Sequence, residues 1–181
     1  MARALLIIDF QNDFCLGGKL PIEHGDEVIP ILNAWMAVAA EKGVPVFASR
    51  DWHPIAHVSF KDQGGPWPPH CVQGSEGAEL HPSVDRTKVD AVVNAGYRPE
   101  LEGYSGFEET ELAEVLRRNA VDELTVVGLA TDYCVRSTAL DALREGFQVT
   151  VDRAGIRGID VEPGDSERAL EELSDAGASL T

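Results

Sequence analysis

The stretch Ala4-Leu-Leu-Ile-Ile8, followed directly by Asp9, is an unbroken apolar run that ends at a carboxylate. A short run of this kind is typical of a strand buried on both faces, as strands are in a parallel sheet between helices. Residues 28–42 then carry helical spacing, and Gly43 ends that segment. A buried strand followed by a helix favours an α/β fold.

The same alternation continues through most of the chain, without an internal repeat or a low-complexity tract. Further strands are predicted at residues 44–49, 91–94, 124–128 and 149–152, further helices at 110–119, 132–145 and 167–176, and an edge strand in the last few residues. This order predicts a parallel sheet. A length of 181 residues suits one domain, so we expect residues 1–181 to fold as one unit.

Acidic residues outnumber basic ones, with 31 Asp and Glu against 15 Lys and Arg and a formal charge of −16. This balance leaves no basic stripe that could neutralise phosphates, so binding to nucleic acid or to an anionic membrane is not expected. No apolar run approaches the roughly 18 residues that a membrane span needs. The three cysteines are an odd and sparse set that does not resemble a disulfide framework. We expect a cytoplasmic protein with at least one free thiol.

A segment of about residues 50–88 is rich in Pro, Gly, His and Trp and has little regular periodicity. Loops of this length are usually functional or disordered, and the aromatic residues argue against disorder. The segment contains Asp51-Trp-His53, His57 and Trp67-Pro-Pro-His70. A carboxylate with imidazoles is a suitable ligand set for Zn, Fe or Mn, whereas single loop histidines are more often ordinary surface residues. Spacing alone leaves both interpretations open.

Two further candidates follow predicted strands. Asp9 ends the first strand, and Cys134 lies in Val127-Gly-Leu-Ala-Thr-Asp-Tyr-Cys134, a strand-to-helix turn that Thr131 or Asp132 can cap. Ligand crevices of parallel sheets lie beyond the carboxyl ends of the strands, so Asp9, Asp51 and Cys134 are expected at one rim. The first turn of a helix favours a thiolate, and its free N–H groups can hold an oxyanion. An inert buried cysteine and a turn-capping aspartate are the alternatives.

Several motifs in this order resemble those of one family, the nicotinamidases among the isochorismatase-like cysteine hydrolases. The motifs are Ile8-Asp-Phe-Gln-Asn-Asp-Phe14, Arg50-Asp-Trp-His-Pro54 with His57, Trp67-Pro-Pro-His-Cys71, Tyr104-Ser-Gly-Phe107 and Gly128-Leu-Ala-Thr-Asp-Tyr-Cys134. The resemblance covers nearly the whole chain. It implies a three-layer α/β/α fold around a central, mainly parallel sheet, and assembly into a homo-oligomer.

The resemblance also implies a reaction. Nicotinamide, and by expectation pyrazinamide, would be hydrolysed to the carboxylate and ammonia through a thioester on Cys134, with Asp9 as the base. Backbone amides of Ala130 and Cys134 would form the oxyanion hole, beside a cis peptide between Ala130 and Thr131.

A binding site for the substrate and for one cofactor is implied as well. Asp51, His53 and His70 would hold one divalent metal ion, which is Zn, Fe or Mn. His57 would be either a further ligand or a close neighbour of the ligands. Three aromatic side chains would enclose or line the pocket for the flat pyridine ring: Phe14, Trp67 and Tyr104.

One position departs from the family pattern, which has a lysine before a glycine on the third strand as the third member of the catalytic set. Here the segment is Asp90-Ala-Val-Val-Asn-Ala-Gly96, so the lysine position is Ala95. Alanine cannot lower the pKa of a thiol or stabilise negative charge. We expect a chain that binds nicotinamide and metal but turns over poorly. Ala95 is explained either by a deliberate lysine-to-alanine replacement or by a natural chain with altered activity.

Three other functions remain open. The chain can be a related hydrolase of another small amide, which a metal that binds a pyridine nitrogen would argue against. It can be a non-catalytic protein that binds pyridine carboxamides, which Ala95 favours. It can also be a metal-stabilised α/β protein with an inert thiol, in which case Cys134 would be alkylated no faster than Cys15.

Overall fold

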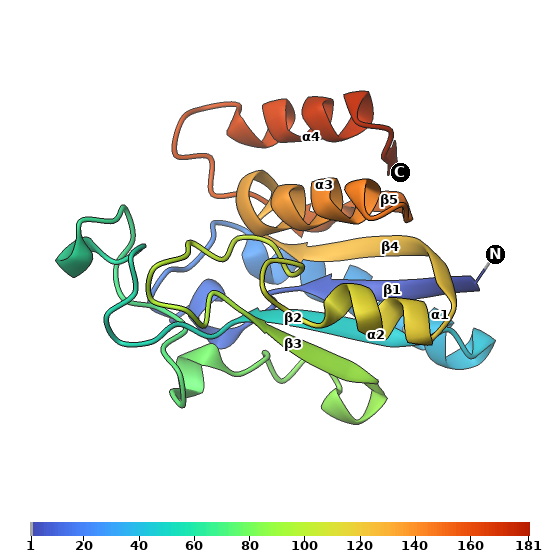
Figure 1. Cartoon of the computed structure of the whole chain (residues 1–181), viewed down its shortest axis with the longest axis horizontal. Helices are drawn as coiled ribbons and strands as arrows, with labels where there is room; N and C mark the ends of the chain where they lie inside the picture. The colour runs from blue at the N-terminus through green and yellow to red at the C-terminus, as the bar shows by residue number, and fades with distance from the viewer. Residues whose placement is uncertain (1) are drawn as a thin grey trace.

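The computed structural model describes residues 2–181. Its centre is a six-stranded sheet in the order β3-β2-β1-β4-β5-β6, in which all neighbouring strands are parallel (Figure 1). The strands are β1 (Ala2–Ile8), β2 (Val46–Asp51), β3 (Ala91–Ala95), β4 (Val121–Leu129), β5 (Gln148–Arg157) and β6 (Ser179–Leu180). The chain starts in the middle of the sheet and builds outward in both directions.

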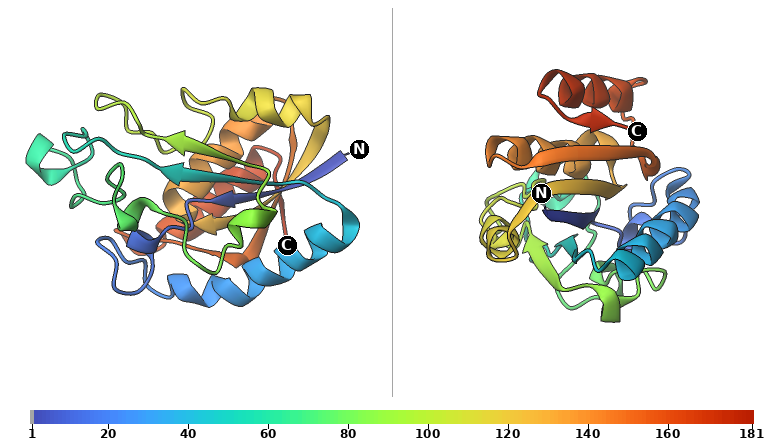
Figure 2. Two further views of the ribbon diagram at one scale, coloured as in Figure 1. Left: turned by 90° about the horizontal axis from the view of Figure 1, so that it is seen from below. Right: turned by 90° about the vertical axis from the view of Figure 1, so that its right-hand side faces the viewer.

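Helices cover both faces of this sheet, and Figure 2 shows them on opposite sides when the molecule is viewed end-on. One face packs against α1 (Ile29–Lys42), through residues such as Leu5 and Ile7 of β1. The other face packs against α2 (Leu112–Arg118), α3 (Arg136–Arg144) and α4 (Asp165–Asp175), through residues such as Leu6 and Ile8. Successive residues of β1 therefore belong to different halves of the core, which explains why the whole run is apolar.

The predicted three-layer α/β/α fold is confirmed, and the sheet is entirely parallel in the described residues. Element boundaries differ from the sequence prediction where tertiary pairing extends a strand. β2 continues to Asp51 and β3 to Ala95 because these two residues are partners in the β2–β3 ladder. The predicted helix at 132–145 begins as a π-helical turn, Thr131–Val135, before α3.

The long segment between β2 and β3 is ordered without being regular. It contains the short 3₁₀ helices Lys61–Gln63, Glu76–Ala78 and Arg86–Lys88 and the isolated bridges His53–Val72 and Phe60–Trp67. Most of it, together with the loops after β1 and β3, lies at the carboxyl ends of the strands, on the left in Figure 1, and its last part returns to the start of β3. Within residues 2–181, no helix is long and apolar enough to cross a bilayer.

Candidate active site

Four of the predicted site residues lie where parallel strands end. Asp9 follows β1, Asp51 and Ala95 are the last residues of β2 and β3, and Cys134 lies shortly after β4. Asp51 and Ala95 are register partners, so their side chains point to the same face of the sheet. Val93, two positions before Ala95 on β3, points to the same face and belongs to the half of the core that contains Cys134. The sheet therefore brings together side chains that are up to 125 positions apart in sequence.

Cys134 is buried in the π-helical turn that leads into α3. Backbone N–H groups in the first turn of a helix have no intrahelical acceptor, so they are available to a ligand. Two details of the prediction are wrong. The cis peptide joins Leu129 and Ala130, one bond earlier than expected and directly after the last residue of β4. Neither predicted cap is used, since Asp132 accepts hydrogen bonds from the N–H groups of Ile159 and Asp160 instead.

Asp9 is fully enclosed and has an unusual backbone conformation for a residue other than glycine, with φ of +43°. The Ser49 hydroxyl donates a 2.6 Å hydrogen bond to Asp9 Oδ1. The Cys134 thiol is a further hydrogen-bond partner of this carboxyl group. Burial first, and then the charge of Asp51, raise the pKa of Asp9 to about 8. A carboxyl group of this kind is suited to accept and return a proton near neutral pH.

The Cys134 thiol does not gain the low pKa that its place in a helix turn predicts. Burial raises its pKa well above the ordinary value, and the nearby Asp9 and Asp51 raise it further. Cys15 and Cys71 are free and buried as well, and burial also raises the pKa of Cys15, to about 12. Burial is the largest cause, because it penalises the charged thiolate more than the partial charge of a helix terminus favours it.

The pKa of Asp9 predicts a pH-dependent stability in the metal-free protein. Between about pH 4 and pH 8 the folded chain keeps the Asp9 proton, whereas the unfolded chain releases it, so stability falls as pH rises through this window. Asp9→Asn removes this loss and keeps an oxygen for the Ser49 hydroxyl. We expect the variant to gain roughly 1–3 kcal/mol over the parent between pH 4 and pH 8.

Urea unfolding of both proteins at several pH values, with a chelator present, measures this gain. Asp62→Asn, in the exposed 3₁₀ helix Lys61–Gln63, controls for the change in net charge. A difference between Asp9→Asn and the parent that stays constant with pH would contradict the prediction.

Asp51, His53 and His70 form a candidate metal site, with one possible ligand atom from each within 4.8 Å of the others. Asp51 Oδ2 lies 3.3 Å from His53 Nε2 and 3.8 Å from His70 Nε2. The Nδ1 atoms of the two rings donate to the carbonyl oxygens of Gly96 and Pro68, at 2.9 and 2.8 Å. In the neutral rings, both Nε2 lone pairs therefore face the Asp51 carboxylate. A cation bound by the two nitrogens and the carboxylate would stabilise this arrangement.

Electrostatics at this cluster agree with a cation-binding role. Although burial opposes its ionisation, Asp51 has a lowered pKa because the two imidazoles favour its anion. Burial opposes the charged form of His53 too, yet Asp51 raises the pKa of that ring. His57 stacks on His53 with ring centroids 4.0 Å apart. Burial lowers the pKa of His57 to about 4, and its Nε2 has no hydrogen-bond partner within residues 2–181. His57 is thus a neutral neighbour that stacks on His53 without belonging to the three-residue cluster.

Comparison with known proteins identifies the family. A family model described as the isochorismatase domain matches residues 3–181. The chain belongs to the isochorismatase family. It is 43% identical over 199 residues to the nicotinamidase of Escherichia coli K12, an alignment that covers 98% of this chain and 93% of that protein.

Two solved structures of this isochorismatase-family fold are closely similar. One is a pyrazinamidase of Pyrococcus horikoshii in complex with zinc, with a TM-score of 0.93 and 45% identity over 100% of this chain and 99% of the other. The second is a protein from L. infantum in complex with nicotinate, with a TM-score of 0.90 and 34% identity over 99% of this chain and 92% of the other.

Sequence reasoning missed two residues that hold the ligand set of this isochorismatase domain. The buried Gln11 side chain donates to the carbonyl oxygens of Asp51 and Ala78 and accepts from the Asp51 N–H, each at 2.8 Å. Gly96, with φ of +60°, supplies the carbonyl oxygen that orients His53. Gln11 lies inside a recognised motif and Gly96 directly follows Ala95, but neither has a side chain that signals chemistry by itself.

Gly96 also leaves room for His53, and this yields a test. A Cβ atom at Gly96 would lie 2.4 Å from His53 Cε1 and 2.6 Å from Nδ1. Gly96→Ala should therefore displace the ring and weaken divalent-metal binding about 10- to 100-fold. Gly43→Ala is the matched control, because Gly43 has a similar φ of +63° and open space around it. Isothermal titration with Zn²⁺ measures both, and equal affinities in the two variants would refute the role of Gly96.

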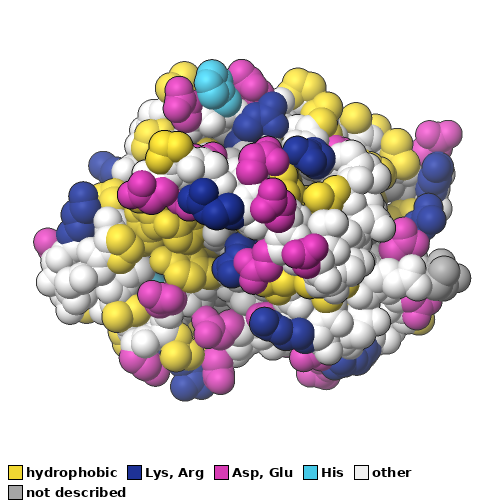
Figure 3. All heavy atoms as spheres, turned by 90° about the horizontal axis from the view of Figure 1, so that it is seen from above, with side chains coloured by type: hydrophobic (Ala, Val, Ile, Leu, Met, Phe, Trp, Pro, Cys, Tyr) yellow, Lys and Arg dark blue, Asp and Glu magenta, His cyan; other side chains and the backbone are white. Residues whose placement is uncertain are grey.

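Aromatic residues border the polar site. The Phe14 ring lies 5.5 Å from that of His70, and Trp67 Nε1 donates a 3.0 Å hydrogen bond to the Tyr104 hydroxyl. Tyr133, which the sequence analysis did not single out, contacts both Trp67 and Tyr104 with centroid distances of 5.1 and 5.3 Å. Figure 3 shows apolar side chains gathered in a hollow at the same end of the molecule.

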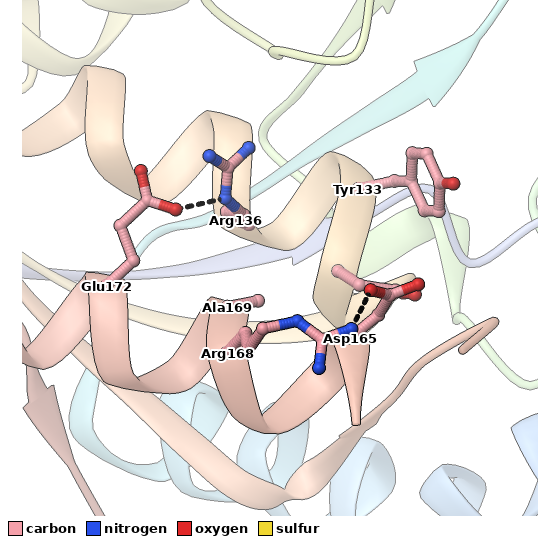
Figure 4. Close-up of a pocket in the computed structure, with 7 residues that line it drawn as sticks. Tyr133, Arg136, Asp165, Arg168, Ala169 and Glu172 are labelled. Atoms are coloured by element: carbon pink, nitrogen blue, oxygen red, sulfur yellow. Dashed lines mark hydrogen bonds and ion pairs between the residues drawn. The ribbon is translucent and has the colours of Figure 1, made fainter. Parts of the chain in front are cut away.

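A separate cavity of about 310 Å³ lies between α3 and α4, and Tyr133 also borders it (Figure 4). Its charged residues pair with one another. Arg136 Nε donates to Glu172 at 2.6 Å, and Arg168 pairs with Asp165. We exclude this cavity from the candidate active site because its charges are already satisfied.

Proposed function

We propose that this chain is a nicotinamidase that hydrolyses nicotinamide to nicotinate and ammonia and also accepts pyrazinamide. The observation that carries the proposal is that two buried clusters of polar side chains share Asp51 at the carboxyl ends of the strands. A thiol and a carboxyl group, Cys134 and Asp9, lie beside Asp51, which also belongs to the aspartate and histidine set. The similar proteins named as nicotinamidase and pyrazinamidase support this substrate class.

The reaction follows from the positions of Asp9 and Cys134. Asp9 accepts the thiol proton, and the sulfur attacks the carboxamide carbon. Backbone N–H groups of Ala130 and Cys134 stabilise the oxyanion. Asp9 returns the proton to the amide nitrogen as the carbon–nitrogen bond breaks. Ammonia departs, and the acyl group remains bound to Cys134 as a thioester. Water, deprotonated by Asp9, then releases nicotinate and restores the thiol.

Substrate orientation is assigned to the other groups. Asp51, His53 and His70 hold one divalent metal ion, for which Zn, Fe and Mn are suitable. When bound, this ion supplies an electrophilic anchor for the pyridine nitrogen. His57 stays neutral beside the ligands, which is consistent with its low pKa. The flat ring is bordered by aromatic side chains, namely Phe14, Trp67 and Tyr104.

Ala95 makes slow turnover part of the proposal. This buried side chain carries no charge beside Asp51, so it cannot stabilise the buried thiolate as it forms. The same observation favours a second candidate function, a protein that binds pyridine carboxamides without cleaving them. Residues 1–181 are proposed as one domain with a metal-binding region at about 50–88. Cytoplasmic location, homo-oligomer assembly and the absence of nucleic-acid or membrane partners stay predictions.

The experiment combines binding with single-turnover chemistry. Protein loaded with Zn²⁺, Mn²⁺ or Fe²⁺ is mixed with nicotinamide, and bound ligand, ammonia, nicotinate and protein mass are followed. We expect metal-dependent binding, slow nicotinate formation and a nicotinoyl adduct on Cys134. Tight binding of nicotinamide without any product would favour the second candidate, a non-catalytic binding protein. If nicotinamide is neither bound nor converted, it is not the substrate.

A further inference from the structure

A second group of potential metal ligands lies next to the first. Asp9, Asp51 and Cys134 each offer one ligand atom, and these atoms lie within 4.8 Å of one another. All three side chains are buried, with relative exposures of 1, 4 and 5%. Ligands at about 2.0–2.3 Å from one ion lie at most about 4.6 Å apart. Small side-chain movements would thus bring all three atoms into one coordination sphere.

Deprotonation of this group would place several negative charges together in one buried site. Ala95, the register partner of Asp51, contributes no charge on that face. Like charges held together in a buried site favour uptake of either a proton or a cation.

Asp51 supplies an independent sign that a ligand is missing. Its Oδ2 lies near the two imidazoles, whereas its Oδ1 is buried and has no hydrogen-bond partner within residues 2–181. An unpartnered buried carboxylate oxygen is costly, and native structures usually satisfy such atoms by water or an ion. A carboxylate can bridge two ions through its two oxygens, so Asp51 can serve both groups of ligands.

We infer that Asp9, Asp51 and Cys134 form a second divalent-cation site, which takes a thiophilic ion such as Zn²⁺ and shares Asp51 with the first site. Binding replaces the protons of the Cys134 thiol and of the Asp9 carboxyl group by metal–ligand bonds and releases both protons to solvent. The bound ion neutralises the two carboxylates and occupies the lone pair that a nucleophile needs. Thiophilic metal in excess of one equivalent therefore protects Cys134 from alkylation. Harder ions such as Mg²⁺ do not, because they avoid sulfur ligands.

Metal binding itself provides the test, so the outcome does not depend on the proposed hydrolysis. Co²⁺ is titrated into metal-free protein, and the near-ultraviolet sulfur-to-cobalt absorption and bound metal per chain are recorded. We expect two equivalents, with the sulfur signal from the second site. Cys134→Ala and Asp9→Asn should each lower the affinity for one equivalent of Co²⁺ about 100-fold and leave the affinity for the other equivalent unchanged. Cys15→Ala, a buried cysteine outside the group, should keep both.

Two further variants separate the sites. His70→Ala should weaken the first site and retain the sulfur signal. Ala95→Lys should remove the sulfur signal and retain the first equivalent, because an ammonium group would compensate the same carboxylates. A single equivalent at saturation, or a second equivalent that survives in both Cys134→Ala and Asp9→Asn, would overturn the inference. A sulfur signal that survives in Cys134→Ala would do so too.

Discussion

Replacing Ala95 by lysine is expected to raise kcat/KM for nicotinamide about 100-fold or more, in line with the effect of one well-placed charge in an active site. The new ammonium group would be buried on the same sheet face as Asp51, among carboxylates that favour its charged form. It would lower the pKa of the Cys134 thiol, which Asp9 and Asp51 now raise. More of the enzyme would then carry the nucleophilic thiolate.

Ammonia release by the parent and by Ala95→Lys, assayed side by side with Zn, Fe or Mn salts, measures this gain. Ala95→Met is the matched control, since methionine has a long unbranched side chain without charge. Equal activation by Met and Lys would show that packing rather than charge limits the parent. If neither the parent nor Ala95→Lys releases ammonia, the amide-hydrolase proposal loses its main support.

Cys134→Ala should reduce nicotinate formation by about 1,000-fold or more, because it removes the atom that forms the thioester. The loss is measured best in the Ala95→Lys background, where the starting rate is higher. Nicotinamide binding should persist, since the metal ligands and aromatic residues are unchanged. Intact-protein mass spectrometry should detect the nicotinoyl adduct only when Cys134 is present.

Cys15→Ala serves as the control for loss of a buried thiol, because Cys15 lies in the other half of the core. Its rate per folded molecule should match that of the parent. Substantial nicotinate formation by Cys134→Ala would point to direct attack by water and would rule out a covalent intermediate on this residue.

The candidate site illustrates what motif spacing can predict. Asp9, Asp51 and Cys134 each follow an apolar strand, and the carboxyl ends of parallel strands meet at one edge, so their proximity could be expected from sequence. The supporting contacts could not. Gln11 holds Asp51 through two hydrogen bonds, and Ser49 holds Asp9 through one. These contacts depend on register and rotamer, which side-chain chemistry alone does not encode.

The thiol shows where local reasoning fails. Its place in a helix turn predicts a low pKa for Cys134, but the structure surrounds it with Asp9 and Asp51 in a buried space. A helix terminus contributes about half a charge, which does not offset the cost of burying a thiolate near Asp51. The net effect therefore has the opposite sign from the one that the local motif suggests.

By itself, the sequence determined the alternation of buried strands and helices, the edge at which chemistry gathers, and the uncharged residue at position 95. Apolar periodicity and the order of the segments along the chain are local properties that can be identified directly in the sequence. Only the tertiary structure decided that Asp51 stands between two groups of ligands, one with His53 and His70 and one with Asp9 and Cys134. Such sharing depends on which of two carboxylate oxygens faces each neighbour, and that is set by the packing of segments that lie far apart in the chain.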